Sequence, residues 1–374
     1  MKHNLIEKLL DGVEVEWEAL GEVSEIGTGR SNRQDEDEKG EYPFYVRSKN
    51  ILKSNVFEFD ETAIIVPGEG GIGDIYHFVQ GKYALHQRAY RIHLLSKKIN
   101  AKFLYYIMSE SFKQYILIKS VGATSISIRK PMLEKFKIPI PPLNIQAEIV
   151  RILDTFTELT AELTAELTAE LTARKKQYNY YREQLLTFEE GEVEWKPLGE
   201  LAENHDSMRK PITSGLREIG DIPYYGASGI VDYVKDFIFD GDYLLVSEDG
   251  ANLLARRIPI AFSISGKSWV NNHAHVLKFN TYAERKYIEC YLNSIDLTPY
   301  ISGAAQPKLN QRNLNAIQIP NPSLEDKERI VSILDKFETL TTSIQEGLPR
   351  EIELRQKQYE YYRNMLLSFP KEEV

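Results

Sequence analysis

A glycine-rich segment, GEGGIG, is the first pattern in this chain that could do chemistry. Gly68, Gly70 and Gly73 satisfy G-x-G-x-x-G, which in dinucleotide-binding proteins opens a helix toward the pyrophosphate. Here the residues that follow alternate like a strand, and no acidic residue occurs between Asp74 and Glu110 to hold a ribose. We therefore interpret the segment as a tight turn, or as a loop whose backbone approaches a ligand.

Two further patterns resemble catalytic motifs only in part. The tripeptide GKS at 266–268 could end a P-loop, but that motif needs a glycine five residues before its second glycine, and Ala261 occupies this position. Asp37 and Lys39 fall in the acidic run DEDEKGE, which is typical of a loop rather than of a nuclease. Neither pattern predicts a nucleotide or nuclease site.

The pair His273 and His275 could chelate a metal ion, because alternate residues of a strand point to the same face. No third ligand with a suitable spacing occurs nearby. A structural role or a role facing DNA is therefore the interpretation that we favour.

Basic residues are concentrated in two stretches of a chain whose net charge is −9. Residues 75–140 contain 12 Lys and Arg against 2 acidic residues, and residues 251–320 contain 8 against 3. Clustered Lys and Arg can neutralise phosphates and release counterions, so each stretch is a candidate for nucleic-acid binding. The alternative is a solvated charged face.

Each basic stretch contains an expected core helix, over 101–119 and 281–294, and then a polar turn, VGATSISIRK or SGAAQPKLNQR. Such turns can be ordinary loops, but their side chain types also bind phosphates and base edges. The candidate DNA contacts are Arg47, Lys49, Gln87, Arg88, Ser125, Ser127, Arg129, Lys130, Tyr225, Ser228, Arg256, Arg257, Asn271, Asn272, Gln306, Lys308 and Gln311.

A tetrapeptide repeat, Thr-Ala-Glu-Leu, occurs in three perfect copies at 160–171. Ala, Glu and Leu favour helix, and no Gly or Pro interrupts 144–188, so this whole segment is predicted to be one helix. Each repeat would add about 6 Å of length and about 40° of rotation. The segment would then act as a spacer whose length is set by the number of repeats.

The chain is an internal duplication. An offset of 181 residues aligns IVRILDTF with IVSILDKF, and RKKQYNYYREQLLTF with RQKQYEYYRNMLLSF. VEVEWEALGE aligns with GEVEWKPLGE, and YPFY with IPYY, at offsets of 178 and 180. Because the period is too long for a solenoid repeat, we predict two related domains, each followed by a helix.

The apolar stripe of each helix needs a partner, and the duplicate helix is the obvious one. We predict an α/β (α+β) fold in which two similar domains are joined by two long helices that form an antiparallel coiled coil about a pseudo-twofold axis. The second helix is expected to break at Gly347-Leu-Pro349. The candidate spacer or partner-docking residues, for which core packing is the alternative, are Leu159, Leu163, Leu167, Leu171, Tyr178, Tyr181, Arg182, Tyr359, Tyr362 and Arg363.

The composition is that of a soluble protein with enough apolar material for two cores: 374 residues, 42% of them hydrophobic. A single cysteine, Cys290, excludes a disulfide framework and suits a reducing cytoplasm. No secretory leader or membrane span is predicted, because no apolar run approaches about 20 residues.

The order of domains and helices, with IPIPPLNIQAEIVRILD, KQYNYYREQLL, IPYYGASGIVDY, NNHAHVL and KQYEYYRNMLL, resembles the specificity subunits of type I restriction-modification systems. The TAEL repeats point to the branch with tetrapeptide spacers. The resemblance implies a target-recognition domain over 1–143, a spacer helix over 144–188, a second target-recognition domain over 189–322 and a second spacer helix over 323–374.

The resemblance also implies the function and the partners. Each domain would read one half of a bipartite, asymmetric sequence in double-stranded DNA, and the helices would set the gap. Two methyltransferase subunits, which use S-adenosylmethionine, and restriction/translocase subunits, which use ATP and Mg²⁺, would assemble with this chain. The chain itself is expected to bind no cofactor and no metal and to have no catalytic activity, because its only adjacent prolines, Pro141-Pro142, lack the N/D-P-P-F/Y catalytic context.

Two other classes of function stay open. A degenerate stand-alone DNA methyltransferase would bind cofactor as an isolated chain. A scaffold of two interaction modules on a coiled coil would bind no nucleic acid at all, even with its partners present.

Overall fold

In the computed structural model, residues 5–71, 73–119, 127–303, 306–343 and 346–370 are described. The chain forms two compact units. Unit 1 comprises Met1–Glu166 together with Ile352–Val374, and unit 2 comprises Leu167–Glu351. Each unit therefore contains one globule and segments of both long helical regions.

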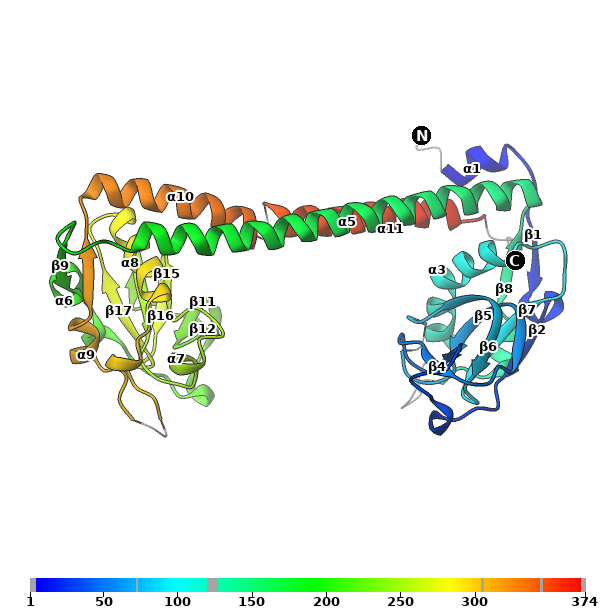
Figure 1. The fold of residues 1–374 in the computed structure, drawn as a ribbon, viewed down its shortest axis with the longest axis horizontal. Coiled ribbons are helices and arrows are strands. Elements are labelled where there is room, and N and C mark those ends of the chain that lie inside the picture. The colour runs from blue at the N-terminus through cyan, green and yellow to red at the C-terminus, as the bar shows by residue number, and fades with distance from the viewer. Residues whose placement is uncertain (1–4, 72, 120–126, 304–305, 344–345, 371–374) are drawn as a thin grey trace. The chain divides into compact units, whose positions relative to one another are not determined.

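Unit 1 is built on a six-stranded sheet in the order β2-β7-β5-β6-β3-β4 (Figure 1). Neighbouring strands are antiparallel except for β3 and β6, which are parallel. In β5, Ile64 and Val66 face the core under helix α3, whereas Ala63 and Ile65 face a second, smaller core. The strands are β1 Glu16–Ala19, β2 Ser24–Thr28, β3 Tyr42–Tyr45, β4 Leu52–Ser54, β5 Phe59–Pro67, β6 His77–Leu85, β7 Ala89–Leu94 and β8 Lys137–Ile140.

Helix α3, Ala101–Lys119, confirms the predicted core helix of the first basic stretch. It buries Leu104, Ile107, Phe112 and Ile116 against the sheet, because these residues recur at helical spacing. Strands β1 and β8 form a separate antiparallel ribbon. The short helices of this unit are α1 Leu5–Leu10, α2 Leu20–Val23, η1 Arg33–Asp35 and α4 Lys130–Glu134.

Unit 2 has two four-stranded sheets, β10-β17-β14-β15 and β12-β11-β16-β13, and a two-stranded ribbon, β9-β18. Strand β14 is fully buried, because Leu244 and Val246 face the core under α8 while Leu245 faces the opposite core. The strands are β9 Glu194–Pro197, β10 Glu203–Asn204, β11 Ile219–Gly226, β12 Gly229–Val234, β13 Phe239–Asp240, β14 Tyr243–Ser247, β15 Ala261–Ile264, β16 Lys267–Val270, β17 Ala274–Lys278 and β18 Gln318–Asn321.

Helix α8, Tyr282–Ser294, confirms the second predicted core helix. It begins with a capping box in which Thr281 accepts the Glu284 N–H and the Glu284 carboxylate accepts the Thr281 N–H. The other short helices of unit 2 are α6 Leu198–Leu201, η2 Asp206–Met208, η3 Ser214–Leu216, α7 Asn252–Ala255, η4 Thr298–Tyr300 and α9 Gln311–Asn315.

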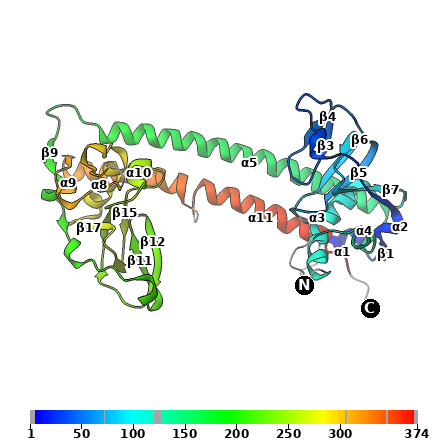
Figure 2. The same cartoon turned by 90° about the horizontal axis from the view of Figure 1, so that it is seen from below.

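Helix α5, Leu143–Leu186, is one continuous helix of 44 residues and contains all the TAEL repeats, as predicted. The second helical region is broken, also as predicted: α10, Leu324–Thr342, ends before α11, Leu348–Leu367, begins (Figure 2). Gly347 has a φ of 89°, and a Cβ there would lie 2.5 Å from the Thr339 carbonyl oxygen. Any side chain at this turn would therefore be strained.

Within unit 1, α5 and α11 run antiparallel. The Phe156 ring lies 5.7 Å from the Tyr362 ring, and the Thr157 hydroxyl lies 3.0 Å from the Tyr359 hydroxyl. Leu366 belongs to the same core as α3, so the end of the chain completes the first globule.

Within unit 2, α5 and α10 make the matching contacts. The Phe337 ring lies 5.6 Å from Tyr181 and 6.3 Å from Tyr178. At the duplication offset of 181, Phe337 corresponds to Phe156 and Tyr181 to Tyr362. The two units thus repeat one contact with the roles of the helices exchanged, and within unit 1 the pairing is antiparallel, as the sequence predicts.

Candidate nucleic-acid interface

Three loops of unit 1 are joined by main-chain hydrogen bonds at Gly68, directly after strand β5. The Gly68 N–H donates to the Arg88 carbonyl at 2.9 Å, and the Gly68 carbonyl accepts the Ile128 N–H at 2.9 Å. A Cβ at residue 68 would lie 3.0 Å from the Arg88 oxygen and 3.2 Å from the Tyr90 ring. We call this three-loop arrangement the loop junction; in unit 1 it favours glycine because the neighbours leave little space.

The loop junction of unit 1 carries exposed basic side chains. Arg47 and Arg88 both donate to the Glu69 carboxylate, at 3.2 and 3.0 Å. The hydrogen bond from Arg88 lowers the pKa of Glu69, so this carboxylate is ionised at neutral pH. One exposed acid thus holds two guanidinium groups beside each other, where they could also contact phosphates or guanine.

The same junction occurs in unit 2, with Glu248, His273 and Leu309 in place of Gly68, Arg88 and Ile128. The Glu248 N–H donates to the His273 carbonyl at 2.9 Å, and the Leu309 N–H donates to the Glu248 carbonyl at 2.7 Å. These are the two bonds that Gly68 makes in unit 1.

Three further contacts support this correspondence. The His86 N–H donates to the Tyr45 carbonyl, and the Asn271 N–H donates to the Tyr225 carbonyl. The side chain of His86 accepts the Arg88 N–H, and that of Asn271 accepts the His273 N–H. The surface ion pairs correspond as well, since Arg88–Glu69 matches His273–Asp249 at 2.8 Å.

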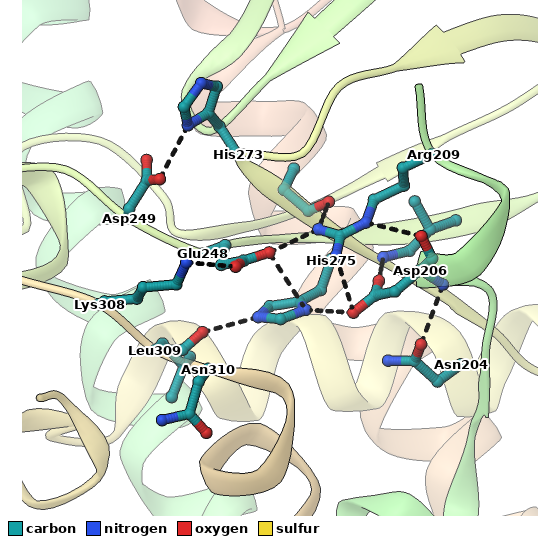
Figure 3. A network of polar contacts seen from close by, with 12 residues as sticks. Asn204, Asp206, Arg209, Glu248, Asp249, His273, His275, Lys308, Leu309 and Asn310 are labelled. Carbon is teal, nitrogen blue, oxygen red and sulfur yellow. Dashed lines mark hydrogen bonds and ion pairs between the residues drawn. The ribbon is translucent and has the colours of Figure 1, made fainter. Parts of the chain in front are cut away.

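The junction of unit 2 differs by a buried ionic network around Glu248 (Figure 3). Its carboxylate accepts from Arg209 at 2.6 Å and forms an ion pair with Lys308 at 3.0 Å. Burial raises the pKa of Glu248, but the hydrogen bonds from Arg209 and Lys308 outweigh it, so this pKa lies below its usual value. The carboxylate is therefore ionised at neutral pH.

A second carboxylate in this network, Asp206, binds His275 and the main chain. Its Oδ2 lies 2.6 Å from His275 Nδ1, and its Oδ1 accepts the Val276 N–H at 2.9 Å. Burial raises the pKa of Asp206, but the hydrogen bond with His275 outweighs it and the net shift is downward. Asp206 is therefore ionised as well.

The two histidines of the H-x-H pair have different environments. The side chain of His273 is half exposed and binds Asp249, whereas the side chain of His275 is 1% exposed. Over the described part of the chain, no three His, Cys, Asp or Glu side chains form a group that could hold a metal ion.

Several predicted DNA contacts come together at the junctions, and others do not. Ser125 lies outside the described residues. Asn271 is buried and supports its turn, and Tyr225 is half-buried against Phe262. Near the junction of unit 1 the exposed or half-buried candidates are Arg47, Lys49, Gln87, Arg88, Ser127, Arg129 and Lys130, and on the loops of unit 2 the exposed candidates are Ser228, Arg257, Asn272, Gln306, Lys308 and Gln311.

Arg256 has a structural role that the sequence analysis did not anticipate. Its backbone is left-handed, with a φ of 50°, and its guanidinium donates to the carbonyls of Leu292, Asn293 and Ile295. It thereby satisfies the carbonyls at the end of α8. Burial lowers the pKa of this guanidinium, which points into the unit and not toward the junction.

The sequence analysis missed Asp206, Arg209 and Glu248. Asp206 and Glu248 lie 27 or more residues from the His275 that they contact, Arg209 lies 39 residues from Glu248, and no motif links such positions. The only signal in the sequence was that Glu248 follows a buried strand and lies two residues before a glycine.

The candidate docking residues on the helices pack within the units. Phe156, Leu159, Leu163, Tyr359 and Tyr362 line a hollow of about 200 Å³ in unit 1, and Leu159 is 55% exposed. Tyr362, which lines this hollow, remains partly accessible. The remaining stripe residues, Leu167 and Leu171, are half-buried in unit 2.

The arginines of the two KQYxYYR motifs have corresponding positions. The Arg182 guanidinium lies over the Tyr178 ring at 5.4 Å, and Arg363 lies over Tyr359 at 5.7 Å. Burial raises the pKa of Tyr178 to about 12, and Arg363 also donates to Glu110 at 2.8 Å. These contacts support the packing interpretation, and Tyr181 remains partly accessible.

The duplicated α/β unit and its repeated loop junction place this chain in the class of proteins that have two related recognition surfaces. The family model described as the type I restriction modification DNA specificity domain matches this chain twice, over residues 14–173 and 190–354. The chain therefore belongs to the type I restriction-modification specificity family, whose members are recognition chains and not enzymes.

Relatives and solved structures agree with this assignment. The chain is 33% identical to the specificity subunit of the Escherichia coli type I restriction enzyme EcoR124I/EcoR124II, over 99% of this chain and 98% of that one. It is 34% identical to the putative specificity subunit S.HindORF215P of Haemophilus influenzae, over 99% and 100%. The fold is similar to that of a chain in a solved structure on complex assembly and conformational transition of the type I R-M system. The TM-score is 0.67 and the sequence identity is 14%, over 95% of this chain and 98% of that one. Among the described helices, none is long and apolar enough to cross a membrane.

Proposed function

We propose that the loop junction of each unit reads one half of a bipartite, asymmetric sequence in double-stranded DNA. The observation that carries this proposal is the repetition of one main-chain scaffold with different exposed side chains. Unit 1 presents Arg47, Gln87 and Arg88 on it, and unit 2 presents Asn272 and Lys308. A shared scaffold with different side chains would give two unlike half-sites, because base edges are distinguished by side-chain donors and acceptors.

The proposal includes the assembly that the resemblance to type I restriction-modification specificity subunits implies. Two methyltransferase subunits with S-adenosylmethionine, and restriction/translocase subunits with ATP and Mg²⁺, would supply the chemistry in the cytoplasm. The partly accessible Tyr181 and Tyr362, which occupy equivalent positions in the two units, are the docking positions that we propose for the two methyltransferase copies.

Mapping of methylated sites tests the proposal. A complex reconstituted with its methyltransferase partners should methylate a two-part sequence, and Arg88→Ala should relax one position of one half by about 1–3 kcal/mol of discrimination. Asn272→Ala should relax a position of the other half only. The control is Lys8→Ala, an exposed charge on α1, which should change neither half. Relaxation of the same half by Arg88→Ala and Asn272→Ala would refute separate readout.

A further inference from the structure

His275 is a buried ring whose two nitrogens both face hydrogen-bond acceptors (Figure 3). Nε2 lies 2.7 Å from the Leu309 carbonyl oxygen, and Nδ1 lies 2.6 Å from Oδ2 of Asp206. A carbonyl can only accept, and an ionised carboxylate can only accept. Both ring nitrogens must therefore carry protons, so the geometry requires the imidazolium.

The charges that face this ring come from three other segments. Helix η2 supplies Asp206, and Arg209 directly follows this helix. The residue after β14 is Glu248, whose carboxylate lies 3.9 Å from Nδ1, and the third loop supplies Lys308. Arg209 also donates to the Ala274 carbonyl at 2.9 Å, on the strand that carries His275. Two carboxylates thus lie against the ring on one side.

The ring and the Glu248 main chain both hold the third loop of the junction at Leu309. The Leu309 N–H donates to the Glu248 carbonyl, and the Leu309 carbonyl accepts from His275. Leu309 itself is fully buried, whereas Lys308 before it and Gln311 shortly after it are exposed. The position of these two candidate base-reading side chains therefore depends on a hydrogen bond donated by a charged ring.

Unit 1 has no counterpart to this ring. By the correspondence of Arg88 with His273, the residue that matches His275 is Tyr90, whose ring lies beside Gly68. The contrast makes unit 1 an internal control for any effect that depends on protonation of His275.

We propose that His275, through its hydrogen bond to the Leu309 carbonyl, is a positioning residue for recognition of the half-site read by unit 2. The inference rests on the proposed function, because it assigns the role within that readout. When the side chain at position 275 cannot donate to the Leu309 carbonyl, the third loop of the junction is no longer held in place. Discrimination at this half-site then falls, while discrimination at the other half-site does not.

The first experiment measures initial methylation rates of the reconstituted complex on the target duplex and on duplexes altered in one letter of either half. The discrimination ratio at the unit 2 half-site should fall by about tenfold or more when the hydrogen bond to the Leu309 carbonyl is lost, and the ratio at the other half should stay constant. An equal change in both ratios, or no change in either, would overturn the inference.

Two substitutions separate positioning from simple stability. In His275→Gln the amide can take the place of Nε2 and donate to the Leu309 carbonyl, whereas in His275→Asn it can take the place of Nδ1 and contact only Asp206. Discrimination at the unit 2 half should be ordered wild type, Gln, Asn, with about a tenfold loss for Asn. A purely structural role would instead lower all rates together and leave both ratios unchanged.

The outcomes distinguish this inference from the function on which it rests. If the wild-type complex methylates no two-part target, or if the two units do not read separate halves, the proposed function fails. If the wild type reads both halves and the unit 2 ratio is insensitive to both substitutions of His275, only the role of His275 fails.

Discussion

The two units of this protein organise equivalent loops with the same main-chain hydrogen bonds but stabilise them by different means. In unit 1 the central residue is Gly68, and the ionic contacts lie at the surface, where Glu69 binds Arg47 and Arg88. In unit 2 the central residue is Glu248, whose side chain is 11% exposed and binds the equally buried Arg209. The difference shows that the backbone arrangement survives duplication, while the side chains that support it are replaceable.

Replacement at this position needs changes in its neighbours. A carboxylate can occupy position 248 because His275 stands where unit 1 has Tyr90, and because Arg209 and Lys308 neutralise it. Burial of an ionised group is tolerated only with such partners. The comparison therefore predicts that unit 2 is more sensitive than unit 1 to loss of charge at its junction.

The largest expected effect concerns the spacer helix, which we propose sets the gap between the half-sites read by the two units. Deletion of one TAEL repeat, residues 164–167, shortens α5 by about 6 Å and rotates it by about 40°. Since one base pair advances about 3.4 Å along the duplex, the gap should shorten by one or two base pairs, with both half-sites unchanged. Mapping of methylated sites measures this, and Glu166→Gln, which keeps the length of the helix, is the control. An altered half-site with an unaltered gap would show that the repeats do not set the spacing.

The next effect tests the buried network directly. Glu248→Ala removes the carboxylate that buried Arg209 binds at 2.6 Å and leaves it only the Asp206 carboxylate at 3.4 Å; breaking a buried pair costs up to about 3–5 kcal/mol. Hydrogen exchange should show faster opening of the strands of unit 2, with unit 1 unchanged. The matched control is Asp249→Ala, which breaks the more exposed pair with His273 and should cost at most about 1 kcal/mol. Similar costs for the two substitutions would contradict the buried network.

Acid should destabilise unit 2 more than unit 1. The folded-state pKa values of Asp206 and Glu248 lie below their ordinary values of 3.8 and 4.5. Their contribution to stability is therefore fully present above about pH 5 and is lost as pH falls below the ordinary values and through the depressed ones. Hydrogen exchange at decreasing pH should show protection lost first in unit 2. Glu248→Gln should reduce this pH dependence, and an unchanged acid profile would show that Glu248 is not responsible.

The smallest effect concerns the surface pair of unit 1. Glu69→Gln removes the charge that binds Arg47 and Arg88, and the folding stability should change little, because these groups are exposed. Both guanidinium groups become available to phosphates, so DNA affinity should rise and its salt dependence should steepen. Titration of the complex with DNA at several salt concentrations measures this. Asp249→Asn, the matched change in unit 2, releases only His273 and should do less.

The order of the domains and helices, and the pairing of the helices, could be predicted from the sequence. The α5 helix, the break at Gly347 and the antiparallel pairing follow from helix propensity, from glycine and proline positions and from apolar stripes, all of which act over a few residues. The side chains of the candidate interface could be predicted only in part from the sequence. The exposed Arg88 and Lys308 were predicted, whereas Arg256 was assigned to the surface although its left-handed backbone directs it to the end of α8.

The sequence by itself determined that this protein consists of two related α/β units with paired spacer helices, because duplication, periodicity and helix-breaking residues are properties of the chain in order. Only the tertiary structure decided that Gly68 and Glu248 occupy equivalent places and that Asp206, Glu248 and Leu309 surround His275. The physical reason is that these groups meet across strands and loops distant in sequence, and that main-chain hydrogen bonds align them without requiring any particular side chain.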